Sequence, residues 1–218
     1  MKIEQLKPLE KLPYFTISGF KQALNAKEGD NQRIRDMLWR WAKRGHIIRL
    51  KRGIYMTRRF YELHQNHASF RPAVSAILLP QSYISLEYVL QQEGILTDVT
   101  YPTTSVTLKN TKTIDNSVGT FIYRHVKPQL YTGFRQESFY GMIFNQSSAA
   151  KALFDYFYLR PLSRSLYTHK INLAEELRLN LGELSSKTKN EFEEYIEMSD
   201  SPKMMFIYQN LRKTIWQP

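Results

Sequence analysis

The stretch that most constrains the fold of this chain runs from residue 43 to residue 53 and reads KRGHIIRLKRG, with Lys-Arg-Gly at both ends. Gly45 follows a helical pattern, and we expect it to end that helix because glycine adopts a left-handed conformation at low cost. The β-branched residues after Gly45 predict a strand, and Arg52-Gly53 predicts a tight turn into a second strand over 54–56. The segment therefore predicts a helix end followed by a β-hairpin with cations at its tip.

Two short helices are predicted before this hairpin. Thr16 is a suitable N-cap for the first helix, whose apolar residues are Ile17, Phe20, Ala23 and Leu24. The segment AKEGDN interrupts it, and Asp30 or Asn31 is expected to cap the second helix. The second helix turns one apolar stripe inward, formed by Ile34, Met37, Leu38 and Trp41. A helix, a second helix with a basic outer face and then a hairpin is the order of elements in a winged helix-turn-helix.

The positive charge of the chain is concentrated in this part. The formal net charge is +11 over 218 residues, and residues 1–62 hold 15 basic against 6 acidic residues, whereas the remainder holds 16 against 14. Basic domains of this kind usually bind polyanions. The asymmetry predicts a DNA-binding head on a near-neutral body, and two alternatives stay open: a merely solubilising surface, and a winged helix that binds protein.

Eleven residues are the candidate contacts with double-stranded DNA. Arginine can read guanine and glutamine can read adenine with two hydrogen bonds each, so base edges are assigned to Gln32, Arg33, Arg35 and Trp39. Phosphate contacts, which set register and contribute much of the affinity, are assigned to Arg40, Lys43, Arg49, Lys51 and Arg52. Arg44, beside the first turn, and Arg58 extend the same surface. The outward-pointing Trp39 is either packed under a neighbouring segment or exposed for a partner.

A different composition begins at Arg71, and Pro72 or the segment HQNHASFRP is the expected linker. Ser82 or Ser85 is expected to start a helix, and Ser147 or Ser148 to cap a buried one that Pro161 ends. Helices are predicted over 85–94, 149–159, 172–181, 189–198 and 204–216, and strands over 101–109, 118–126 and 138–146. The sequence therefore predicts an α/β protein of the α+β type. A winged helix-turn-helix domain spans residues 1–62, and a larger mixed α/β domain with a helical C-terminal tail spans residues 71–218.

Four segments, spread in order over most of the chain, resemble the AbiEi-type antitoxins of bacterial type IV toxin–antitoxin systems, which act in abortive infection and phage defence. They are LWRWAKRGHIIRLKRGIYM (38–56), SYISLEYVLQQEGIL (82–96), SSAAKALFDYFYL (147–159) and NLAEELRLNL (172–181). The resemblance implies a transcriptional repressor whose winged helix binds its own promoter, at inverted repeats. It also implies a C-terminal domain that assists DNA binding and neutralises a cognate nucleotidyltransferase-like toxin. The chain departs from the family at Ala150, where relatives often carry an acidic residue.

Polar residues within these motifs have structural explanations. We favour capping and helix packing, over contacts made by the antitoxin domain, as the explanation for Ser82, Tyr83, Glu87, Lys151 and Asp155. Asp155, on an apolar helix, is either a buried catalytic acid or, as we favour, the acceptor of a core hydrogen bond or salt bridge. The acidic run Glu191–Glu197 is interpreted as a solvated face that is also available to a basic toxin.

Common enzyme patterns are absent from the sequence. No Glu or Asp is followed two residues later by Lys, as a restriction-like nuclease site would need, and the Gly-Ser and Asp-x-Asp pairs of nucleotidyltransferases are missing. GxxxxGK[ST], GxGxxG, GxSxG and HExxH do not occur. His64 and His67 resemble half a zinc site, but a polar linker is the simpler interpretation. We therefore expect a protein without catalytic activity, cofactor or metal.

The remaining sequence features concern location. The chain has no cysteine, no apolar run long enough to span a membrane and no segment that resembles a signal peptide. These features predict a soluble cytoplasmic protein without a membrane partner. Two other functions remain as alternatives: a one-component regulator whose body senses a small ligand, and an unfamiliar nuclease guided by the head.

Overall fold

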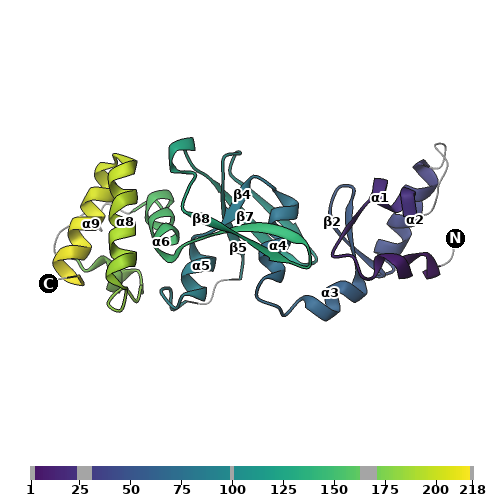
Figure 1. Ribbon diagram of the computed structural model, residues 1–218, viewed down its shortest axis with the longest axis horizontal. Helices are drawn as coiled ribbons and strands as arrows, with labels where there is room; N and C mark the ends of the chain where they lie inside the picture. The colour runs from purple at the N-terminus through teal and green to yellow at the C-terminus, as the bar shows by residue number, and fades with distance from the viewer. Residues whose placement is uncertain (1–2, 24–30, 99–100, 163–170, 217–218) are drawn as a thin grey trace.

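The computed structural model describes residues 3–23, 31–98, 101–162 and 171–216. These residues form a mixed α/β protein of the α+β type with a three-stranded and a six-stranded sheet. We call residues 3–57 the head and residues 70–216 the body. The head lies at one end of the long axis, the larger sheet lies in the middle, and the C-terminal helices lie at the other end (Figure 1).

The head combines short helices with a small antiparallel sheet of strand order β1-β3-β2. Its elements are the 3-10 helix η1 (Ile3–Leu9), β1 (Phe15–Thr16), α1 (Ile17–Ala23), α2 (Asn31–Lys43), β2 (Ile47–Lys51) and β3 (Ile54–Thr57). Thr16 Oγ1 accepts a hydrogen bond of 3.0 Å from the backbone N–H of Gly19, as expected for an N-cap. The predicted apolar stripe of α2 is buried. Gly45 and Gly53 have φ values of 76° and 80°, which confirms both predicted turns.

One predicted feature of the head falls outside the described residues. The interruption AKEGDN, with Asp30 as a possible cap, covers 26–31, and the description resumes at Asn31, the first residue of α2. Leu24, predicted on the apolar face of the first helix, is also outside the described residues.

The β2–β3 hairpin is shared between the head and the body. Ile47 and Tyr55 pack in the core of the head, whereas Ile48, Leu50 and Met56 belong to the core of the body. Alternate residues of a strand face opposite sides of a sheet, so one face of the hairpin packs in the core of the head and the other face packs in the core of the body. The head is therefore packed on the body through its hairpin.

The connection between head and body is partly helical. It consists of α3 (Arg58–His64) and a turn, and the body begins with α4 (Phe70–Leu78), so the end of the predicted linker HQNHASFRP is helical. Pro72 lies in the first turn of α4, where its missing N–H costs no intrahelical hydrogen bond. Residues 65–69 alone remain as a turn.

The body is organised around a mixed sheet of strand order β6-β7-β5-β4-β9-β8. Its strands are β4 (Ser82–Ile84), β5 (Thr103–Thr107), β6 (Lys112–Asn116), β7 (Gly119–His125), β8 (Phe134–Phe139) and β9 (Met142–Ser147). The pairs β4–β9 and β5–β7 are parallel, and the other neighbouring pairs are antiparallel. The strands predicted over 101–109 and 118–126 correspond to β5 and β7.

Two predictions for the body are wrong in detail. The segment 138–146 is not one strand, because Tyr140 and Gly141 both have positive φ and turn the chain from β8 into β9. This is the backbone that a two-residue hairpin turn requires. The segment 172–181 is helical only in α7 (Leu173–Glu176). After that helix Leu179 forms a bridge with Leu96, so an extended tertiary contact replaces the predicted helix.

Helices cover the sheet and form the C-terminal end of the molecule. They are α5 (Glu87–Gln92), the 3-10 helix η3 (Pro128–Leu130), α6 (Ala149–Leu159), α7, α8 (Ser186–Ser199) and α9 (Pro202–Thr214). The backbone N–H of Lys151 donates to Ser148 Oγ, which confirms the predicted cap of the buried helix α6. Helix α6 lies between the sheet and the pair α8–α9 (Figure 1). Among the described helices, none is long and apolar enough to cross a membrane.

Candidate nucleic-acid interface

Helix α2 presents a polar and cationic face to solvent. Because its apolar stripe packs into the head, the opposite side of the helix is exposed, including Gln32, Arg35, Trp39 and Lys43. Gln32 Nε2 donates a hydrogen bond of 2.8 Å to Asp36 Oδ1, four residues later on the same face. The Gln32 amide, which we assign to a base edge, is therefore hydrogen-bonded to Asp36 on the same helix.

A groove between α2 and the hairpin brings several predicted residues together. Its volume is about 430 Å³. The lining residues are Ile17, Arg35, Asp36, Trp39, Arg49, Arg52, Gly53 and Tyr55. Three guanidinium groups thus share the groove with one carboxylate, and Trp39 and Tyr55 supply its aromatic surface. Such a groove suits an anionic ligand that also offers flat or apolar groups.

A second cationic hollow lies along α2. It is about 140 Å³ in volume and is lined by Arg33, Met37, Arg40, Trp41 and Arg44. Arg33 and Arg40 belong to α2 and Arg44 directly follows it, so three guanidinium groups share this hollow. Arg40 Nε also donates a hydrogen bond of 3.3 Å to the backbone carbonyl of Asp36.

The structure places Trp39 in solvent. Its side chain is 61% exposed, so of the two alternatives for this residue, packed or exposed, the second holds. The Nζ atom of Lys43 lies over the indole at 5.1 Å from the ring centroid. This cation–π contact holds the ammonium beside the aromatic ring at the edge of the groove.

Lys51 does not lie on the predicted surface. A register shift between Arg49 and Lys51 interrupts the regular alternation of β2, and such an irregularity turns the next side chain toward the other face of the sheet. The Nζ atom of Lys51 donates hydrogen bonds of 2.7 Å and 3.1 Å to the carbonyls of Ile77 and Leu78. Burial, and then the charge of Lys112, lower the pKa of this ammonium.

Lys51 is therefore part of the junction between head and body. Its two carbonyl acceptors lie at the C-terminal end of α4, where free carbonyls favour a cation. Two of the three ammonium donors of Lys51 therefore have acceptors inside the protein, which favours a contact at this junction over the predicted phosphate contact.

Arg58 is also set apart from the groove. Its Nε forms an ion pair of 2.8 Å with Glu62 one turn later in α3, and neither cationic hollow of α2 is lined by it. Its neighbour Arg59 pairs with Glu10 at 2.9 Å. The predicted extension of the cationic surface through Arg58 is thus largely neutralised by carboxylates.

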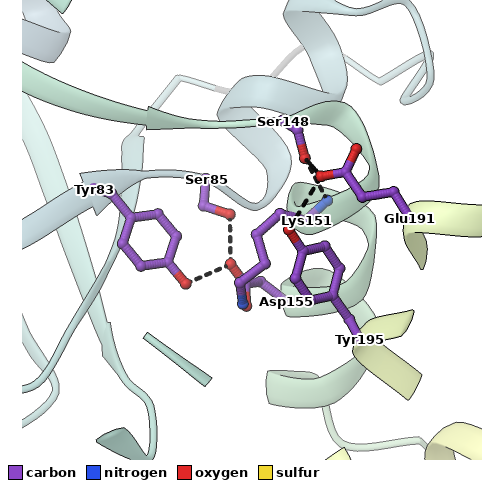
Figure 2. Close-up of polar contacts among 7 residues, drawn as sticks. All are labelled: Tyr83, Ser85, Ser148, Lys151, Asp155, Glu191 and Tyr195. Atoms are coloured by element: carbon purple, nitrogen blue, oxygen red, sulfur yellow. Dashed lines mark hydrogen bonds and ion pairs between the residues drawn. The ribbon is translucent and has the colours of Figure 1, made fainter. Parts of the chain in front are cut away.

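A buried polar network lies inside the body, where side chains of β4 and α6 meet (Figure 2). Lys151 and Asp155, one turn apart on α6, form an ion pair in which both side chains have an exposed fraction of 0%. Asp155 Oδ2 accepts hydrogen bonds of 2.9 Å from the Tyr83 hydroxyl and 2.8 Å from the Ser85 hydroxyl. The structure therefore agrees with the favoured interpretation of Asp155 as an acceptor of core hydrogen bonds and a salt-bridge partner.

Aromatic rings surround the cation of this pair. The Nζ atom of Lys151 lies 4.8 Å from the ring centroid of Phe154, 5.4 Å from that of Tyr195 and 5.6 Å from that of Tyr83. Burial lowers the pKa of Lys151 and raises the pKa of Asp155, and each charge opposes the shift of the other. Burial and the partner's charge thus act in opposite directions on both groups, and the pair lies in a desolvated site where its own contacts hold it, which is the arrangement of a structural ion pair.

The acidic run of α8 is divided between interior and surface. Glu191 Oε1 accepts hydrogen bonds from the hydroxyls of Ser148 and Tyr195 (Figure 2), whereas Glu194 and Glu197 are exposed. The part of this run that is free to meet a partner is therefore smaller than the sequence suggests.

His64 and His67 have aromatic neighbours. The ring of His64 lies 4.3 Å from both Phe60 and Tyr140, and the ring of His67 lies 4.7 Å from Phe139, measured between centroids. Over the described ranges, no group of three or more His, Cys, Asp or Glu side chains is placed to hold a metal ion.

Of the predicted residues, the groove between α2 and the hairpin is lined by Arg35, Trp39, Arg49 and Arg52. The second hollow is lined by Arg33, Arg40 and Arg44. Sequence reasoning missed Tyr55, because a regular register from the turn at Arg52-Gly53 pairs Arg49 with Met56, and only the register shift in β2 places Tyr55 opposite Arg49. Neither the models of known protein families nor the curated proteins compared with this sequence match it.

Proposed function

We propose that this protein is a DNA-binding antitoxin that represses its own operon and neutralises a cognate nucleotidyltransferase-like toxin in the cytoplasm. The observation that carries the DNA-binding half is the groove in which Arg35, Arg49 and Arg52 surround Trp39. The antitoxin half is supported by the four ordered sequence segments that resemble the AbiEi-type antitoxins.

The order of elements in the head supports a winged helix-turn-helix. A short strand, β1, leads into α1 and α2, and it pairs with the hairpin that follows them. In such a domain the second helix enters the major groove of DNA and the hairpin tip lies beside it. Here α2 and the hairpin tip carry the cations, and the hollow between them opens toward solvent.

The polar side chains of α2, of Arg44 after it and of the hairpin suit different parts of a duplex. Guanidinium groups bind phosphate oxygens with two parallel hydrogen bonds, so Arg49 and Arg52 on the hairpin are assigned to one sugar-phosphate backbone. Arg40, Lys43 and Arg44 near the end of α2 are assigned to the other backbone. Gln32, Arg33 and Arg35, toward the start of α2, are assigned to base edges.

Binding of the purified protein to its own promoter fragment and to scrambled DNA, measured across a salt series, tests this proposal. Promoter binding should be selective, because base edges are read. If each of the five assigned cations contacts one phosphate, binding should weaken with salt with a log–log slope of roughly −4.5. Equal binding to both fragments would contradict the repressor assignment. Co-expression with the neighbouring toxin tests the antitoxin half separately.

Lys51 and Arg52 provide a matched pair of neighbouring cations. Lys51→Met keeps the aliphatic chain but removes the ammonium that binds the α4 carbonyls, so the free energy of unfolding should fall by about 1 kcal/mol. For this variant, the slope of log affinity for the promoter against log salt concentration should not change. Arg52→Met should leave stability unchanged and make the slope shallower by about 0.9.

Urea denaturation and the same salt series check both variants. A shallower slope for Lys51→Met would show that its ammonium contacts DNA and would restore the original assignment of this residue.

A further inference from the structure

Trp39 is not required by the packing of the head. It lies on the solvent side of α2 with 61% of its surface exposed, while the opposite stripe of the helix fills the core. A single exposed apolar residue is common on proteins. What distinguishes Trp39 is its surroundings, because it is an exposed apolar side chain in a groove lined by Arg35, Arg49 and Arg52.

The chemistry of the Trp39 side chain indicates which kind of group it can recognise. Lys43 Nζ lies over the ring at 5.1 Å from its centroid. An indole has one N–H donor and no acceptor, so it recognises hydrogen-bonding groups poorly compared with the guanidinium groups beside it. What it adds to the groove is apolar area.

The base edges of duplex DNA offer one apolar group to such a surface. In the major groove each base pair presents donors and acceptors, and thymine alone presents a methyl group, at C5. Helix α2 has 13 residues, and an α-helix fits the major groove. Trp39 lies one turn beyond Arg35 and two turns beyond Gln32 on the same face, so it lies among the residues assigned to base edges.

We infer that Trp39 contacts the 5-methyl group of a thymine and determines specificity at that base pair. The inference rests on the proposed function and adds to it a base preference that hydrogen-bonding side chains do not supply. Arginine recognises guanine and glutamine recognises adenine by hydrogen bonds, and the indole recognises thymine by apolar contact.

Replacement of thymine by deoxyuridine tests the inference, because it removes the methyl group and nothing else. Each thymine of the bound promoter fragment is replaced in turn, and affinity is measured at one salt concentration. At one thymine in each contacted site the wild-type protein should lose about four-fold in affinity, the value expected for one buried methyl group. The other thymines should have no effect.

Two variants of Trp39 complete the test. Trp39→Ala should bind the thymine and deoxyuridine fragments equally well, and Trp39→Phe should keep the preference because it retains an apolar ring. Affinity for scrambled DNA, which depends on phosphate contacts, should be the same for all three proteins and serves as the control for folding.

The outcomes separate this inference from the proposed function. If promoter-selective binding is present but no thymine depends on its methyl group, the inference is wrong and the proposed function stands. The inference is also wrong if Trp39→Ala keeps the preference for thymine over deoxyuridine. It is wrong as well if Trp39→Phe loses as much affinity as Trp39→Ala, because that result would indicate a hydrogen bond from the indole N–H to a phosphate. If the wild-type protein does not select the promoter, the proposed function itself fails.

Discussion

Replacing Arg35, Arg49 and Arg52 together with alanine should weaken promoter binding by two to three orders of magnitude at about 0.1 M salt. Because only Arg49 and Arg52 are assigned to phosphates, the log–log salt slope should become shallower by about 1.8. These residues line one groove from α2 and from the hairpin, so the variant removes cations from both sides of the proposed DNA path. None of the three is buried in the core. The loss should therefore appear in affinity and not in stability, as measured by fluorescence anisotropy and urea denaturation.

The matched control removes the same amount of charge elsewhere. Arg58, Arg59 and Arg135 each pair with a nearby carboxylate on the surface, and their joint replacement by alanine leaves the groove intact. We expect at most a small change in promoter affinity. An equal loss in both triple variants would mean that net charge, and not the groove, attracts the DNA.

Asp155→Ala should lower the free energy of unfolding by about 3–5 kcal/mol, which is typical when one partner of a buried ion pair is removed. The variant leaves the Lys151 ammonium in a site with no exposed surface. It also removes the acceptor of the hydroxyl groups of Tyr83 and Ser85. Equilibrium urea denaturation measures the change, with Asp115→Ala as the surface control, expected to stay within about 0.5 kcal/mol of the wild type.

A double variant keeps this prediction testable if Asp155→Ala does not fold. Lys151→Met combined with Asp155→Leu removes both charges and fills similar volume, so it should recover most of the lost stability. If the double variant is as unstable as Asp155→Ala, the unpaired charge is not the cause, and the lost hydrogen bonds of Tyr83 and Ser85 would account for the effect.

Local patterns in the sequence predicted the elements whose stability is local. The stripe of α2, the cap at Ser148 and the turns at Gly45 and Gly53 depend on spacings of a few residues, and the structure confirms each of them. The strands β4 and β6 were not predicted. The first has three residues, and the second is largely exposed, so neither shows the apolar alternation that marks a strand.

The candidate interface was predicted in part, because regular periodicity places most of its residues correctly but does not reveal an irregularity in a strand. Arg35, Trp39, Arg49 and Arg52 were assigned to one surface because helix and strand periodicity place them outward, and they line one groove. Lys51 was misplaced because regular alternation puts it on the face of Arg49. A register shift in β2 redirected it toward the C-terminal end of α4.

The sequence by itself determined which residues form helices and turns in the head, where the positive charge is concentrated, and that α6 is buried. These properties follow from residue spacing and from glycine conformation, which need no distant partner. Only the tertiary structure decided that Asp155 meets Tyr83 of β4 and Ser85 just after it, about 70 residues away, and that the hairpin packs against both cores. Such contacts depend on which segments the fold brings together, and the free energy of a buried charge is set by those partners and not by its neighbours in the chain.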